Sequence, residues 1–126
     1  HSNLRRQRQM CIRDRCKMIS AKLYILQRLT ALIMAPLVLG HLVLMIYAVQ
    51  GGLSASEILG RTQGSAFWAI FYALFVFAVS VHAAIGVRTV LFEWLKIRGS
   101  VLELLSWGLG LGLLVMGLYS VYAVTA

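Results

Sequence analysis

Three long apolar runs dominate the pattern of hydrophobic and polar positions along the chain. They cover Leu29–Gln50, Ala66–Val87 and Leu104–Ala126, and none of them contains Lys, Arg, Asp or Glu. Each run has 22 or 23 residues, and about 20 helical residues cross the ~30 Å hydrocarbon core of a bilayer. Because lipid offers the backbone no hydrogen-bonding partners, such spans should be α-helical. The pattern therefore predicts an all-α membrane protein with three transmembrane helices.

The polar positions between the runs set the expected boundaries. We expect helices at about 21–48, 65–92 and 101–126, in a single domain that covers residues 18–126. Residues 1–17 show no apolar periodicity and are expected to form a disordered basic tail. If the natural chain starts at Met18, that tail is a non-native extension.

Two local features bear on how the spans pack. Pro36 removes one backbone hydrogen bond from the first span and should bend it, which membrane helices tolerate. Gly108 and Gly112 form a GxxxG pair in the third span. Such a pair allows another helix to approach the backbone closely.

The charge of the chain indicates its orientation in the membrane. The net charge is +8, but residues 1–28 hold eight basic residues and one acidic residue, and the other 98 hold four and three. This one-sided distribution favours a topology signal over a nucleic-acid-binding surface, and the positive-inside rule places the N-terminus in the cytoplasm and the C-terminus outside. We therefore expect a multi-pass protein of the bacterial inner membrane, in contact with lipid and without a nucleic-acid partner.

The strongest candidate for chemistry is His82 in the second span. His82, Gly86 and Thr89 share one face of a helix. Gly86 leaves a notch where a flat ligand can approach the backbone, and Arg88 lies where the apolar run ends and can meet an anionic group. This arrangement is half of a haem site, with His82 as an axial ligand of the iron. The alternative is a histidine that packs between helices and bonds a hydroxyl or a carbonyl.

His41 in the first span lies at another depth. It is 13 residues from Arg28, or about 20 Å, whereas His82 is six residues from Arg88, or about 9 Å. If both arginines mark the inner boundary, the two imidazoles cannot easily share one iron within one chain. We expect the second axial ligand of His82 to come from another polypeptide. His41 is then either a ligand of a second, outer haem or a structural residue.

Tyr24 and Arg28 lie one helical turn apart at the inner end of the first span. A cation and a phenol on one face suit the carbonyl oxygen of a quinone, which gains electron density on reduction. The alternative is that both residues anchor the helix end at the membrane interface.

These residues together resemble a known family. The segment Arg28–Ala31 (RLTA), followed one span later by His82–Arg88 (HAAIGVR) and by Glu93, is similar to the cytochrome b membrane-anchor subunit of succinate dehydrogenase and fumarate reductase. The resemblance covers roughly Tyr24 to Trp94. The chain departs from the family pattern at five positions: Gln27 stands for His, Tyr24 for Ser, Ala31 for Gly, Thr89 for a second His and Glu93 for Asp.

The resemblance implies a function for the assembly. The chain would be a haem b-binding, quinone-reactive anchor that passes electrons from succinate oxidation in the tricarboxylic acid cycle to a quinone. His82 would hold the haem iron, Arg88 a haem propionate, and Arg28 would line the quinone pocket. Expected partners are an iron–sulfur subunit, a flavoprotein subunit, and a second anchor subunit or second copy that supplies the other axial histidine. The chain itself would be non-catalytic.

Two other functions fit the residues. One is an anchor of the same complex that binds no haem and only docks the soluble subunits. The other is a small transporter or scaffold subunit with structural histidines. Only the first span is interrupted by proline, whereas broken-helix transporters interrupt corresponding spans in both halves.

Overall fold

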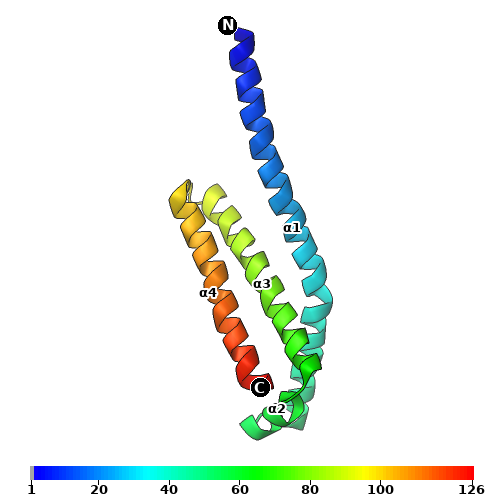
Figure 1. Cartoon of the computed structure of the whole chain (residues 1–126). Helices are drawn as coiled ribbons and strands as arrows, with labels where there is room; N and C mark the ends of the chain where they lie inside the picture. The colour runs from blue at the N-terminus through cyan, green and yellow to red at the C-terminus, as the bar shows by residue number, and fades with distance from the viewer. Residues whose placement is uncertain (1) are drawn as a thin grey trace.

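The computed structural model describes the backbone of residues 2–126 and the side chains of residues 3–7 and 21–126. The chain forms four helices, α1 (Ser2–Gly51), α2 (Ala55–Thr62), α3 (Ala66–Glu93) and α4 (Ser100–Thr125) (Figure 1). Three segments are long and apolar enough to cross a membrane: Ala21–Gly51, Ala66–Glu93 and Ser100–Thr125. The predicted three-span α-helical architecture is therefore confirmed. The basic end of α1 and the C-terminus lie at opposite ends of the bundle (Figure 1), and which end faces the cytoplasm stays a prediction.

Helix α1 is longer than its membrane-spanning part. Its first residue is Ser2, and the part that can cross a membrane is Ala21–Gly51. The segment has no Gly or Pro before Pro36, and its Arg, Gln, Leu and Met residues favour the helix. The sequence predicts that residues 1–17 form a disordered, non-native tail. Most of these residues have side chains outside the described part, so this stays a prediction. Pro36 lies inside α1, which continues to Gly51.

The connection between the first two spans contains the short helix α2. Ser54 caps this helix, because its hydroxyl accepts a hydrogen bond from the Glu57 amide at 3.3 Å, while the Glu57 carboxylate accepts one from the Ser54 amide at 3.1 Å. This reciprocal pair is a capping box. The hydrogen bonds from the Ser54 side chain and backbone also lower the pKa of the Glu57 carboxyl. At the other end of α2, Thr62 donates to the carbonyl of Val124 at 2.6 Å, which ties α2 to the end of α4.

Helices α3 and α4 form the closest packing in the described part of the chain. A Cβ atom added at Gly110 would lie 2.9 Å from the Ala84 Cβ, and one added at Gly117 would overlap the Val76 side chain. The helices therefore meet at Gly110 and Gly117. The expected GxxxG contact is not used between these helices, because Gly108 and Gly112 face open space.

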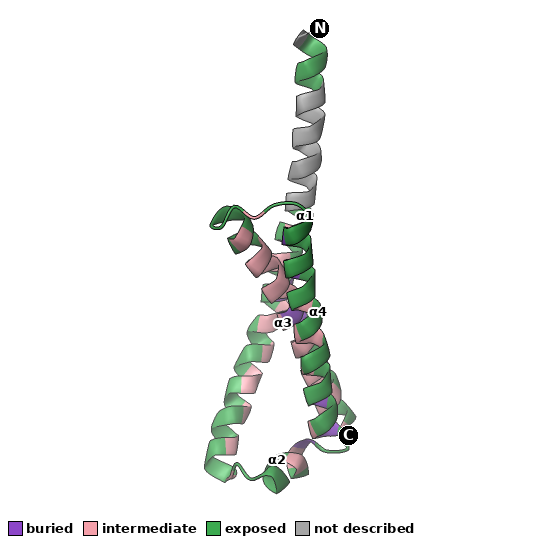
Figure 2. Ribbon diagram, turned by 90° about the vertical axis from the view of Figure 1, so that its left-hand side faces the viewer, coloured by how far each residue is buried: buried purple, intermediate pink, exposed green. Residues whose placement is uncertain are grey.

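Most of the apolar surface of the helices stays exposed. Among the described side chains, few are buried, and Figure 2 shows them as small patches where helices cross. Helix α1 contacts α3 over part of its length, for example where a Cβ at Gly40 would lie 3.3 Å from the Phe71 ring. In a three-span protein such faces are covered by lipid or by another subunit.

The two kinds of glycine in α4 give a stability test. Gly117→Ala should destabilise the α3–α4 pair by about 1–3 kcal/mol, because β-branched Val76 has little freedom to move away. Gly112→Ala is the matched control, since its new methyl group meets open space. Thermal unfolding in detergent, followed by helical circular dichroism, measures both. Equal stability of the two variants would contradict the assigned contact.

Candidate functional site

His82 and Thr30 join α3 to α1 at the centre of the predicted haem site. The His82 Nδ1 atom lies 3.3 Å from the Thr30 hydroxyl oxygen. That oxygen also lies 2.9 Å from the carbonyl oxygens of Leu26 and Gln27, which precede it by four and three residues in α1. Thr30 is only 6% exposed, so this contact lies in the interface between the two helices.

The number of protons at Thr30 determines the tautomer of His82. A threonine hydroxyl has one proton and two lone pairs. The two carbonyl contacts are shorter than the histidine contact, and a helical threonine commonly donates to such carbonyls. We infer that the proton goes to the carbonyls and that the hydroxyl accepts from Nδ1–H of His82. Nε2 then keeps its lone pair, and no described residue hydrogen-bonds to it.

Gly86 lies one turn from His82 and also faces α1. A Cβ added at Gly86 would meet the Gln27 side-chain nitrogen at 3.5 Å, an ordinary contact. The side-chain amide of Gln27 therefore lies beside the notch that Gly86 leaves in α3. The Gln27 Oε1 atom is buried and has no hydrogen-bond partner among the described residues. A buried acceptor of this kind calls for a donor from another molecule.

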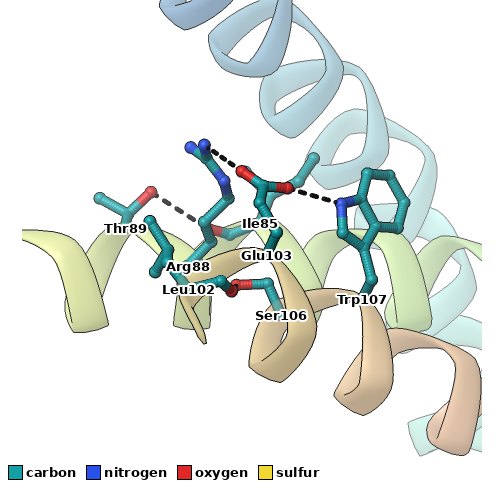
Figure 3. A network of polar contacts seen from close by, with 7 residues as sticks. All are labelled: Ile85, Arg88, Thr89, Leu102, Glu103, Ser106 and Trp107. Carbon is teal, nitrogen blue, oxygen red and sulfur yellow. Dashed lines mark hydrogen bonds and ion pairs between the residues drawn. The ribbon is translucent and has the colours of Figure 1, made fainter. Parts of the chain in front are cut away.

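Arg88 points away from the His82 face, toward α4. Its guanidinium donates to the Glu103 carboxylate at 2.8 Å, and the other carboxylate oxygen accepts from the Trp107 indole at 2.8 Å (Figure 3). This ion pair joins the C-terminal end of α3 to the N-terminal end of α4. Arg88 and His82 therefore do not share one contact surface, and the predicted propionate contact of Arg88 stays a prediction. Thr89, which was expected on the His82 face, bonds only the Ile85 carbonyl among described residues.

Tyr24 and Arg28 lie close together, as their spacing predicts. The Arg28 guanidinium donates to the Tyr24 hydroxyl at 3.3 Å and lies 5.7 Å from the centre of its ring. Tyr24 is 61% exposed, and no described residue of α3 or α4 bonds either side chain. Any site built on this pair must therefore be completed by another molecule.

His41 lies in a second cluster, toward the end of the bundle that holds α2. Its ring centre is 5.5 Å from that of Phe75 and 6.0 Å from that of Tyr72. The Nδ1 atom is buried and has no partner among the described residues. A cavity of about 440 Å³ borders His41, and Arg61 also lines it.

The two described histidines lie at different levels of the bundle. His82 is level with Thr30 in α1, and His41 is 11 residues further along α1, or about 16 Å. The same order holds in α3, where His41 contacts residues 72 and 75. This separation agrees with the difference in depth that residue counting predicts.

Several contacts of the site could not be read from the sequence. In the sequence, Thr30 stands out only as part of the segment Arg28–Ala31, and Gln27 stands out only as a departure from the family pattern. Glu103 was not assigned a role, although an acid at the start of an apolar span is a signal for a charged partner at the same boundary. The described residues contain no group of three or more His, Cys, Asp or Glu side chains that could hold a metal ion.

The fold and these clusters define a multi-pass, α-helical membrane protein whose polar side chains gather between the spans. The sequence model of the succinate dehydrogenase/fumarate reductase transmembrane subunit family matches residues 5–118. The chain therefore belongs to this family and is a membrane subunit of that oxidoreductase complex, which confirms the resemblance found in the sequence. Comparisons with curated proteins and with solved structures give no match.

Proposed function

We propose that the chain is the haem b-binding, quinone-reactive anchor of its complex, and that it passes electrons from an iron–sulfur subunit to a quinone. The observation that carries the proposal is the hydrogen bond between His82 and Thr30. With the tautomer inferred above, this contact holds the imidazole with Nδ1 as the donor and leaves Nε2 with a lone pair, the form in which histidine binds a metal. Haem b, when bound, supplies a one-electron redox centre at this histidine.

Each residue near His82 has a defined task in this proposal. Thr30 sets the tautomer and the orientation of the imidazole, as outer-shell partners of metal ligands do. The side-chain Oε1 atom of Gln27 can accept a hydrogen bond from a bound molecule. Gly86 allows the Gln27 side chain to lie against α3. Arg88 stabilises the inner end of the α3–α4 pair through Glu103 and, on release from it, can meet a propionate.

A second histidine that would hold the haem would come from another polypeptide. His41 is about 16 Å from the level of His82 along α1, which is too far for one iron. The exposed apolar faces around the bundle offer room for a second anchor subunit or a second copy. The soluble partners are the iron–sulfur and flavoprotein subunits, and the membrane is the bacterial inner membrane.

The quinone site uses Arg28 and Tyr24. The guanidinium has five N–H donors, and one of them is bonded to the Tyr24 hydroxyl. The remaining donors, on the exposed side of α1, can stabilise the negative charge that develops on a quinone oxygen. The neighbouring subunit closes this pocket, because no described residue of α3 or α4 covers it.

A second candidate function is a haem-free anchor. It is favoured by the fact that the Arg88–Glu103 pair and the Thr30–His82 bond are complete within the chain. The two candidates differ in one measurement, the presence of a b-type absorption band in the purified complex.

His82→Ala should abolish the reduced-minus-oxidised b-type band of the complex, because the imidazole that binds iron is lost. His41→Ala is the matched control, since it removes an imidazole from the other cluster. It should leave the band unchanged, and a partial loss would instead reveal a second, outer haem. A full band in His82→Ala would refute the haem assignment.

Thr30→Val should weaken haem binding by about 10- to 100-fold, because it removes the acceptor that holds His82 in its tautomer. The weaker donor character of the imidazole should also raise the midpoint potential of any haem that remains. Thr30→Ser keeps the hydroxyl and should restore both properties. Redox titration of the purified complex measures the effect; a Val variant that matches the wild type would show that the bond only packs the helices.

Arg28→Ala should lower the rate of quinone reduction by about 10- to 100-fold, since a hydrogen bond from a charged donor contributes about 1.5–3 kcal/mol. Arg98→Ala is the control, because Arg98 lies over the Phe92 ring in the inner turn and away from Tyr24. Steady-state assays with a short-chain quinone give the comparison. An Arg28→Ala complex as active as the control would leave this pair as an interface anchor.

A further inference from the structure

A cavity between α1, α3 and α4 belongs to neither histidine cluster. Its volume is about 560 Å³. Leu26 lines it from α1, Val81 from α3, and Leu111 and Leu114 from α4. From the charged Glu103 to the apolar Leu114, the lining extends 11 residues along α4, or about 16 Å. It therefore fits an elongated apolar group that lies parallel to the helices.

One end of this cavity is charged. The residues that line it are Lys22, Arg88 and Glu103. Lys22 is near the start of the span Ala21–Gly51, Arg88 near the end of the span Ala66–Glu93, and Glu103 near the start of the span Ser100–Thr125. Arg88 is paired with Glu103 (Figure 3). Lys22 forms no hydrogen bond or ion pair with any of the described side chains, so the charged end carries one uncompensated positive charge.

The interior of the cavity has no free hydrogen-bond donor among the described residues. Ser80 donates to the Val76 carbonyl at 2.7 Å, and Ser106 donates to the Leu102 carbonyl at 2.8 Å. The Trp107 indole donates to Glu103 at 2.8 Å. A quinone ring needs donors for its two carbonyl oxygens, so this interior suits a hydrocarbon chain rather than a quinone ring.

We propose that this cavity binds one acyl chain of an anionic phospholipid, with the phosphate of its headgroup held by Lys22. The charged end meets the headgroup region, and the apolar length meets the acyl chain. Basic pockets between transmembrane helices are suited to anionic headgroups. Such a lipid fills the space that α1, α3 and α4 enclose, and it stabilises the position of α1. Arg88 also belongs to the proposed haem site, whereas Lys22 and Val81, the two cavity positions that the test changes, do not.

The test uses the full chain in its complex, reconstituted in vesicles of equimolar phosphatidylglycerol and phosphatidylcholine, extracted in mild detergent and examined by native mass spectrometry. The wild type should retain phosphatidylglycerol in preference to phosphatidylcholine. Lys22→Gln should lower this preference about fivefold, since one basic residue near an anionic headgroup contributes about 1 kcal/mol. Lys96→Gln is the matched control, because it removes one positive charge from the inner turn outside the cavity. Val81→Phe, which fills the cavity, should reduce retention of both lipids.

Each other outcome overturns the proposal. Equal retention of the two lipids by the wild type, or the same preference in Lys22→Gln and Lys96→Gln, excludes the headgroup contact. Retention that Val81→Phe leaves unchanged places the lipid elsewhere. Displacement by added decylubiquinone assigns the cavity to a quinone, and displacement by inorganic phosphate alone shows an anion site without an acyl chain. The b-type band, recorded on the same samples, reports on the haem separately.

Discussion

One hydroxyl proton between α1 and α3 determines what the centre of this protein can do. Thr30 has two carbonyl oxygens at 2.9 Å and the His82 ring nitrogen at 3.3 Å, and it has only one proton to give. If the carbonyls receive it, the imidazole is the donor, and its second nitrogen keeps a lone pair. The contact that packs two membrane helices would then also prepare His82 for the metal-binding role proposed for it. A leucine at position 30 would pack the same helices but would leave the tautomer of His82 undetermined.

The bundle is held together unevenly, and this matters for its place in a complex. Helix α4 is fixed to α3 by close backbone contact at Gly110 and Gly117, by the Arg88–Glu103 pair and, at its far end, by Thr62 of α2. Helix α1 contacts α3 and leaves a cavity on the side of α4. Apart from Arg88, which faces α4, the residues with predicted chemistry lie on or beside α1, the less tightly packed helix. A membrane subunit whose site faces its least covered helix is suited to completion by other subunits and by lipid.

The sequence predicted the architecture well because the thickness of the bilayer sets the number of residues in each span. Charge-free runs of 22 or 23 residues fix the number and type of the spans whatever their packing. What could not be predicted depends on how the helices rotate against each other. Gly108 and Gly110 differ by two residues, and only the direction of α3 decides which of them is at the contact. The pairing of Thr30 with His82 spans 52 residues and depends on the same rotation. Helix α2 is different, since Ser54 and Glu57 have the spacing of a capping box and could have indicated its start.

The polar groups of the described residues lie at two levels of the bundle. Thr30, His82, Gln27 and the Arg88–Glu103 pair all lie in the half of the bundle that holds the basic end of α1, whereas His41 lies in the other half among aromatic rings. A buried ionisable group is costly in a bilayer and persists where it has a task or a partner. His82 has its partner in Thr30, but the His41 Nδ1 atom has none among the described residues. If the proposed companion subunit lies along the exposed face of α1, it would reach both the level of His82 and the level of His41.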